Sequence, residues 1–384
     1  IMKKIKPRAI LENLIKFNTT SKESNLELIY YIRNFLNEYN VKSNIIFNED
    51  NSKANLHCVI GPEDKPGIIL SGHTDVVPVE GQKWDFNPFS LTEKSGKLYG
   101  RGTADMKSFI AVSLSIVPIL VSKKLKKPIH FAFSYDEEVG CLGAPSLVEF
   151  INNLPVKPMA TIVGEPTKME IVNSHKGVMA FRTVVSGLEG HSSEPEKGSN
   201  TIIAASKLIN YLDKLFEEEK VNSNNLFDPP YTTINVGLIN GGTALNIIPK
   251  ECSFIWEYRY IPEQNPNSII SKFNFFAKNV ILKEMRKVFK EAEISTTPLA
   301  HVLPLKSESA PTLENLVMKL AETNTLNTVS YGTEGGIFQD KNIPTIVCGP
   351  GSIEQAHKAN EFIELNEIEK CEKFLFKLIK YIES

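Results

Sequence analysis

HFAFSYDEEVG, the stretch from His130 to Gly140, places three acids directly after a run of apolar residues. The run is short and rich in aromatic residues, which is typical of a buried strand. Asp136, Glu137 and Glu138 then follow one another, and like charges this close raise one another's cost of ionisation. The acids therefore either spread into water at a loop or meet a strongly positive group.

Runs of the same kind recur through the first 176 residues and alternate with helical patterns. The strands expected from these runs are LHCVIG (56–61), GIILSG (67–72), HFAFSY (130–135) and ATIVGE (160–165). The helices expected from apolar residues at helical spacing are 8–18, 25–39 and 108–124, and Pro118 should end or kink the last one. Near-continuous apolar strands interleaved with helices predict an α/β fold with a mainly parallel sheet covered on both faces.

From about residue 177 apolar residues alternate more clearly with polar ones. The strands expected here are 177–187, 231–240, 251–262 and 292–300, and the helices between them are 199–220 and 267–290. Strand–helix–strand–strand–helix–strand is the arrangement of a ferredoxin-like sandwich.

The chain then returns to an α/β pattern, with a helix near 309–323, a strand at 343–352 and a helix near 366–383. We therefore expect a catalytic domain made of residues 1–176 and 300–384. Residues 177–299 would form an inserted ferredoxin-like α+β domain.

Composition excludes several classes of protein. Acids and bases are mixed along a chain of net charge -2, without a basic stripe of the kind that binds nucleic acid. The five cysteines are scattered, so neither a disulfide framework nor a thiolate metal site is expected, and a reducing cytoplasm fits best. No apolar run reaches the roughly 18 residues of a membrane span.

Histidines and acids stand at the ends of the predicted strands, where ligands bind in open α/β sheets. These residues are His73, Asp75, Glu137, Glu138, Glu165 and His357. In YGRGTADMK, Asp105 follows two glycines and begins a helix, where an acid is favourable. Taken singly, each has an ordinary explanation, such as a solvated loop or a helix cap.

Their convergence on one edge of one sheet favours a metal site instead. Imidazole and carboxylate ligands suit zinc first, with cobalt or manganese as substitutes. Two metals about 3.5–4 Å apart would neutralise a cluster that is otherwise too negative. If Glu137 and Glu138 lie in extended chain, their side chains point to opposite sides, so that one can bind metal while the other faces water.

The motifs SGHTDVVP, GRGTADMK, DEEVG, GEPT and the late AH resemble the metal signatures of the acetylornithine deacetylase and succinyl-diaminopimelate desuccinylase family over nearly the whole chain. The resemblance implies a site for two zinc ions. His73 and Glu165 would hold one ion, Glu138 and His357 the other, and Asp105 would bridge them. Glu137 would be the general acid and base, Asp75 would orient His73, and a cis peptide would follow Asp105.

The resemblance also assigns substrate roles. His191 in GHSS would reach across a homodimer, formed through the inserted lid domain, to the partner's active site. Asn246 in NGGTALNIIP would lie near the substrate, and Arg259 in WEYRYIP would clamp its carboxylate. Glu334 in GTEGG would either pair with a cationic substrate tail or make a hydrogen bond behind the site. Arg259 could instead pair with a neighbouring glutamate on the surface.

The expected activity is removal of acetyl from N-alpha-acetyl-L-ornithine, in arginine biosynthesis. Desuccinylation of N-succinyl-diaminopimelate, action on another acyl amino acid and a dipeptidase activity remain open. A succinyl group needs a cation for its distal carboxylate, and we can place no extra arginine for that task. A catalytically inactive binding or regulatory relative is the alternative of a different class. A nucleotide-binding protein is excluded, because GRGTAD is not a phosphate-binding glycine motif.

Overall fold

The computed structural model describes residues 5–307 and 311–384. Contacts within the chain divide it into two compact units. The first unit comprises Ile1–Ser174, Leu305–Thr328 and Thr333–Ser384, and the second comprises His175–Pro304 and Val329–Gly332. We expected Val329–Gly332 in the catalytic domain, but this segment belongs to the second unit. Two hydrogen bonds attach it there: the Lys176 N–H donates to the Val329 carbonyl, and the Ser330 hydroxyl donates to the Asp228 carbonyl.

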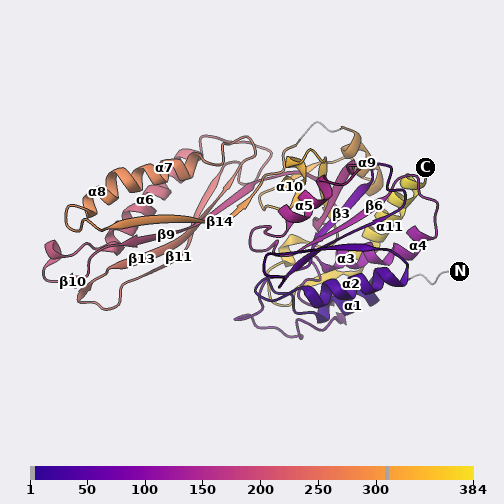
Figure 1. Ribbon diagram of the computed structural model, residues 1–384, viewed down its shortest axis with the longest axis horizontal. Helices are drawn as coiled ribbons and strands as arrows, with labels where there is room; N and C mark the ends of the chain where they lie inside the picture. Colours follow the sequence, from indigo (N-terminus) through magenta and orange to yellow (C-terminus); the bar gives the residue numbers. More distant parts are fainter. Residues whose placement is uncertain (1–4, 308–310) are drawn as a thin grey trace. The chain divides into compact units, whose positions relative to one another are not determined.

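A sheet of eight strands crosses the described part of the first unit, in the order β1-β2-β6-β3-β7-β16-β8-β15 (Figure 1). Its central strands run parallel and have every residue buried: β6 (Ile129–Ser134), β3 (Ile68–His73), β7 (Ala160–Pro166) and β16 (Thr345–Gly349). This centre confirms the predicted parallel sheet.

The outer strands of this sheet depart from the parallel arrangement. β1 (Ser43–Phe47) and β2 (Ala54–Ile60) pair antiparallel with each other, and β2 pairs antiparallel with β6. The connection from β1 to β2 is too short for a crossover, so the two strands must run in opposite directions. The outer strands on the other side are β8 (Val172–His175) and β15 (Asn327–Val329).

Helices cover the sheet on both faces (Figure 1). On one face α3 packs against α1, α11 and the central strands, and on the other α5 contacts α10. The bounds are α1 (Pro7–Lys16), α2 (Leu26–Glu38), α3 (Lys107–Ser115), α4 (Val117–Val121), α5 (Ala144–Asn152), α9 (Pro311–Ala321), α10 (Gly335–Asp340) and α11 (Leu365–Glu383). Pro118 separates α3 from α4 and lies in the first turn of α4, where its missing N–H is harmless. The expected helix near 309–323 begins at residues outside the described ones.

The second unit contains an antiparallel sheet of four strands in the order β11-β13-β9-β14. Its main elements are β9 (Gly177–Ser186), α6 (Thr201–Glu219), β11 (Thr233–Gly241), β13 (Glu251–Tyr260), α7 (Ser268–Phe276), α8 (Leu282–Met285) and β14 (Glu293–Val302). Buried and half-buried residues alternate along β13, so Phe254, Trp256 and Tyr258 point into the core. The strand order and the helices confirm the expected ferredoxin-like sandwich.

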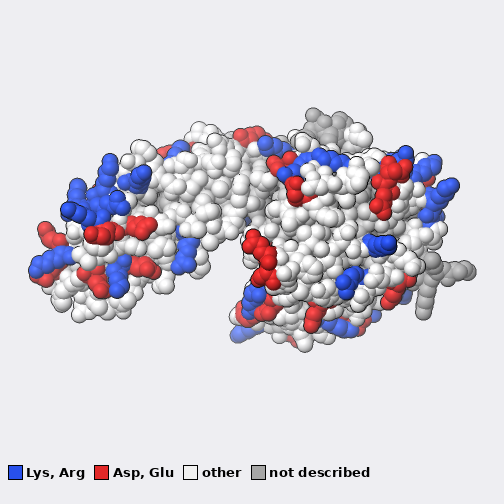
Figure 2. All heavy atoms as spheres, viewed as in Figure 1, with Lys and Arg blue, Asp and Glu red and all other residues white. Residues whose placement is uncertain are grey.

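Short elements complete the described chain. They are β4 (Thr92–Lys94), β5 (Lys97–Tyr99), β17 (Phe362–Glu364), β10 (Gly190–His191), β12 (Ile247–Ile248), the π-helical turn Ala277–Ile281 between α7 and α8, and the 3-10 turns Pro195–Lys197 and Ile353–Gln355. Cationic and acidic side chains are interspersed on the face in Figure 2, and a basic group lies over α8. Within the described residues, every helix is too short or too polar to cross a membrane.

Candidate active site

The predicted metal ligands of the first unit converge at the carboxyl ends of its central strands. His73 ends β3, Glu165 lies near the end of β7, and Glu138 follows β6. Asp105 precedes α3, and His357 lies in the loop after β16. Parallel strands end at the same edge of a sheet, which is why residues so far apart in sequence meet.

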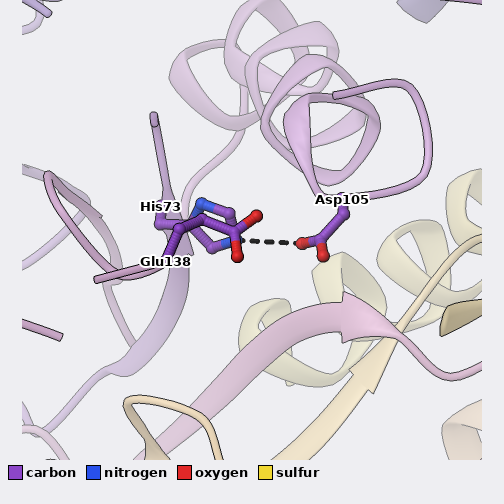
Figure 3. A group of neighbouring side chains, drawn as sticks. All are labelled: His73, Asp105 and Glu138. Atoms are coloured by element: carbon purple, nitrogen blue, oxygen red, sulfur yellow. Dashed lines mark hydrogen bonds and ion pairs between the residues drawn. The ribbon is translucent and has the colours of Figure 1, made fainter. Parts of the chain in front are cut away.

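Asp105 lies between two histidines, each paired with another carboxylate. Its Oδ1 is 3.0 Å from Nε2 of His73, and its Oδ2 is 3.6 Å from Nε2 of His357. In Figure 3 the Asp105 carboxylate points toward the His73 ring, and the Glu138 carboxylate lies beside that ring. His73 Nε2 is also 3.7 Å from Oε1 of Glu165, and His357 Nε2 is 2.9 Å from Oε2 of Glu138. The peptide bond between Asp105 and Met106 is cis, as the resemblance implied.

Asp75 contacts both the His73 ring and the backbone of the acidic loop. Nδ1 of His73 is 2.9 Å from the Asp75 carbonyl oxygen and 3.5 Å from its carboxylate. The backbone N–H groups of Glu137 and Glu138 donate to the two Asp75 carboxylate oxygens, at 3.0 and 3.2 Å. The Ser21 hydroxyl donates to the same carboxylate at 2.7 Å. Asp75 therefore fixes one histidine and the main chain of both glutamates.

The sequence left open whether Glu137 and Glu138 lie in extended chain; in the structure the chain turns directly after Glu137, so Glu138 lies within a turn. Asp136 has a left-handed backbone with φ of 54°, and the Gly140 N–H donates to the Glu137 carbonyl to close a turn. The two side chains still separate: a carboxylate oxygen of Glu137 lies within 4.8 Å of ligand atoms of His73 and Glu165, whereas Glu138 contacts His357.

Removal from water governs the electrostatics of these acids. Burial raises the pKa of Glu137 and of Glu165 well above the usual range, and nearby carboxylates add to both shifts. Burial and the charge of Asp105 raise the pKa of Glu138 to about 7. Burial alone would lower the pKa of His73, but hydrogen bonds to Asp105 and Asp75 raise it well above its usual value.

This donor set fits a pair of divalent metal ions. Oε1 of Glu165 is buried and has no hydrogen-bond partner among the described residues, so it is an acceptor without a donor. Two groups in the described chain could each hold a metal, namely His73 with Asp105 and Glu138, and His73 with Glu137 and Glu165. Nitrogen and oxygen donors crowded in this way need a cation to offset their repulsion.

The predicted substrate residues of the second unit lie in two places. β10 pairs with β12, and the Ser192 N–H donates to the Asn246 carbonyl at 3.1 Å, so His191 and Asn246 are neighbours. The exposed His191 ring contacts the Ser193 hydroxyl at 2.8 Å. Arg259 lies near the far end of β13, about 25 Å along the strand from its first residue, Glu251. There its Nε donates to Glu257 at 3.0 Å. This ion pair is the surface contact that the sequence left open.

Glu334 lies behind the cluster and not on an open surface. It is 1% exposed, and its carboxylate accepts hydrogen bonds from the hydroxyls of Ser71 and Ser134. These contacts favour the hydrogen bond behind the site over contact with a substrate tail, and the substrate role of Glu334 stays a prediction. Ser71 and Ser134 belong to β3 and β6, so Glu334 ties together two strands that deliver site residues.

Several residues around the site escaped the sequence analysis. Lys53 donates to both carboxylate oxygens of Asp136, at 2.6 and 2.7 Å, and so holds the start of the acidic loop. Glu361 and Arg101 form a buried ion pair beside Asp105, with 2.8 Å between Nη1 and Oε2. Glu361 lies shortly after His357 in the sequence, and this proximity was the one available signal.

Comparisons with known proteins agree with this geometry. The family model of peptidase family M20/M25/M40 matches residues 69–381. Acetylornithine deacetylase of Buchnera aphidicola subsp. Acyrthosiphon pisum is 34% identical over 383 residues, 96% of this chain and 96% of that protein. Acetylornithine deacetylase of Pasteurella multocida is 35% identical over 363 residues, 93% of this chain and 91% of that protein.

A solved structure shows the same fold. The M20 family metallo-carboxypeptidase Sso-CP2 of Sulfolobus solfataricus has a TM-score of 0.77 at 20% identity, and the match covers 99% of each chain. Both units of the chain therefore have counterparts in one known architecture. The extent of the family match, together with the identity to the two deacetylases, confirms the resemblance in the motifs: the chain belongs to peptidase family M20/M25/M40.

Proposed function

We propose that the protein is a dizinc amidohydrolase that removes acetyl from N-alpha-acetyl-L-ornithine. The observation that carries the proposal is the position of Asp105, whose two carboxylate oxygens each face a histidine paired with a further carboxylate. Relatives named acetylornithine deacetylase, aligned over nearly the whole chain, support the choice of substrate.

The chain offers ligands for two metals. His73 and Glu165 would hold one ion, Glu138 and His357 the other, and Asp105 would bridge them. Zinc suits these ligands best, and cobalt or manganese would substitute. The chemistry that a bound metal pair supplies is Lewis acidity, which lowers the pKa of a water molecule and polarises the acyl carbonyl.

Glu137 is the proton carrier in this proposal. Burial raises the pKa of Glu137 well above its usual range, which makes its carboxylate a stronger proton acceptor. Glu137 accepts a proton from the attacking water while the water oxygen bonds to the acyl carbon. It then donates this proton to the amide nitrogen as the carbon–nitrogen bond breaks. The products are acetate and L-ornithine with a free α-amino group.

Arg259 would bind the substrate α-carboxylate through its guanidinium fork, and Asn246 would lie near the substrate. The Arg259 side chain is 36% exposed, and its Nε donates to Glu257, so this surface pair would have to open or share the guanidinium when substrate binds.

A homodimer through the second unit is part of the proposal. β11 is an edge strand, and its Leu238 and Ile239 are 64% and 58% exposed. An edge with exposed apolar side chains favours pairing with another chain. A second copy would cover this edge and bring His191 to the partner's active site. Replacing both residues with lysine should yield monomers in light scattering, with reduced turnover.

We also infer that the protein works in the cytoplasm. All five cysteines are free and buried, which suits a reducing compartment.

The test is kcat/KM of the zinc-loaded protein on N-alpha-acetyl-L-ornithine and on N-succinyl-diaminopimelate, beside a chelated control. Chelator-sensitive preference for the acetyl substrate supports the proposal. Preference for the succinyl compound would replace the substrate while keeping the reaction class. Absence of turnover on both, with two metals bound, would direct the search to other acyl amino acids and dipeptides.

A further inference from the structure

Arg101 and Glu361 form an ion pair inside the first unit, next to the candidate site. Each side chain is 1% exposed, and Nη1 of Arg101 is 2.8 Å from Oε2 of Glu361. A buried ion pair gains little net stability, because two charges lose their water. What the pair does to its neighbours is therefore more informative than its own energy.

Glu361 holds the loop that ends in Asp105. Its Oε1 accepts the backbone N–H groups of Ala104 at 2.8 Å and Asp105 at 3.1 Å. Its Oε2 accepts the backbone N–H of Gly102 at 3.0 Å as well as the Arg101 side chain. Three main-chain donors on one carboxylate fix the backbone up to and including the bridging residue.

Arg101 reaches the loop that carries His357. Its Nη1 donates to the Lys358 carbonyl at 3.2 Å, and its Nη2 donates to Oε1 of Gln82 at 2.6 Å. Gln82 in turn donates from Nε2 to the His357 carbonyl at 2.8 Å. The planar guanidinium can make these contacts together with the Glu361 pair, which a lysine ammonium could not match in geometry.

We propose that Arg101 and Glu361 are positioning residues that fix Asp105 and His357 relative to each other and so build the second metal position. Neither residue is assigned contact with substrate. The inference rests on the proposed dimetal function, because it assigns His357 and the second oxygen of Asp105 to one ion. His73 is held by Asp75 and Glu165 lies on the buried strand β7, so the first metal position should depend less on this pair.

The central test is titration of metal-free protein with Zn²⁺ in a calorimeter, for wild type, Glu361→Gln and Arg101→Lys. Loss of a group that orients metal ligands typically weakens affinity roughly 10–100-fold. We expect a loss of this size at the second metal position only. Zinc affinity at the first position should change less than about threefold. Co²⁺ loading should show the same selectivity as an altered visible absorption spectrum at one equivalent.

Gln82→Glu separates the two halves of the network. A carboxylate at this position still accepts from Arg101 but cannot donate to the His357 carbonyl. We expect a smaller loss of affinity at the same single metal position, together with a lower kcat and little change in KM. This partly exposed residue also provides a test if Glu361→Gln fails to fold.

Leu378→Ala is the matched control for lost stability, because Leu378 is buried in α11 and makes no contact assigned to the site. It should lower Tm while leaving both zinc affinities unchanged. Wild-type affinities in Glu361→Gln, or equal losses at both positions, would overturn the inference. These titrations need no substrate: wild type that binds two metals but hydrolyses no acyl amino acid would refute the proposed function and leave this inference standing.

Discussion

The predicted site residues of the two units differ in how firmly they are held. In the first unit, His73, Asp105 and Glu165 are 1%, 5% and 4% exposed and lie in contact with one another, although the side chain of His357 is 55% exposed. In the second unit, His191 is exposed and its ring contacts Ser193, whereas Arg259 is 36% exposed and pairs with Glu257. The difference indicates that the predicted metal ligands of the first unit are positioned largely by contacts with one another, whereas the predicted substrate residues of the second unit are more exposed.

Among the first-unit residues, Glu137→Gln should lower turnover the most. The amide is nearly the same size but cannot carry a proton, so kcat should fall about 10²–10⁴-fold. Zinc content should stay at two per chain, and KM should change little. Turnover near that of wild type, with both metals bound, would remove Glu137 from the proton-transfer role.

Metal removal tests whether the buried acids need a cation. Zinc should bind the folded chain only, so excess free zinc at about a thousand times Kd should raise the unfolding free energy by about 4 kcal/mol for each ion bound. Urea unfolding with zinc and with a chelator measures this difference. An unchanged unfolding midpoint would contradict the metal assignment.

Glu165→Gln provides the matched control for that measurement. Burial raises the pKa of Glu165 above its unfolded value, so in metal-free protein the folded state binds this proton more tightly. The contribution of Glu165 to stability should therefore fall as pH rises from about 4.5, and the glutamine variant should lose this part of the pH dependence. The variant should also gain less stability from zinc.

On the second-unit side, His191→Ala should lower kcat roughly 10²–10³-fold without loss of zinc, as expected of one polar contact made in the transition state. Ser193→Ala is the control, because it removes only the hydroxyl that contacts the His191 ring. Full turnover in His191→Ala would confine the mechanism to first-unit residues.

The sequence predicted the ligands because they follow a simple rule. Buried parallel strands appear as continuous apolar runs, and the polar residues just beyond them must meet at one edge. His73, Glu138 and Glu165 could be placed in this way before any contact was known. The bridging position of Asp105 and the roles of Arg259 and His191 came instead from the family resemblance.

The supporting contacts could not be predicted from sequence. Glu361 accepts backbone N–H groups more than 250 residues earlier in the chain, and such contacts leave no periodic pattern. Glu334 resembled a free acid in a glycine-rich loop, because the two serines that bind it are hidden within β3 and β6. The antiparallel edge of β1 and β2 also escaped, since their apolar residues do not reveal strand direction.

Burial by itself does not make a histidine a metal ligand, and a pH titration of stability tests this within the first unit. His57 and His130 lie on β2 and β6 with 3.1 Å between ring nitrogens. Burial lowers the pKa of His57 to about 3, with the charge of His130 adding to the shift, and burial lowers the pKa of His130 to about 4. Both rings therefore favour their neutral form. The ring of His73, which lies beside carboxylates, favours its charged form instead.

The unfolded chain takes up protons on His57 and His130 below about pH 6.5, whereas the folded chain does not until far lower pH. The contribution of these two histidines to the free energy of unfolding is thus fully present above pH 6.5. It is lost as pH falls, by about 1 kcal/mol for each histidine at pH 5.5. Urea unfolding of metal-free His130→Gln and wild type at pH 7.5 and 5.5 isolates this contribution from that of the site carboxylates. An equal loss in both proteins would show that the pair titrates normally when folded, and would remove the contrast with His73.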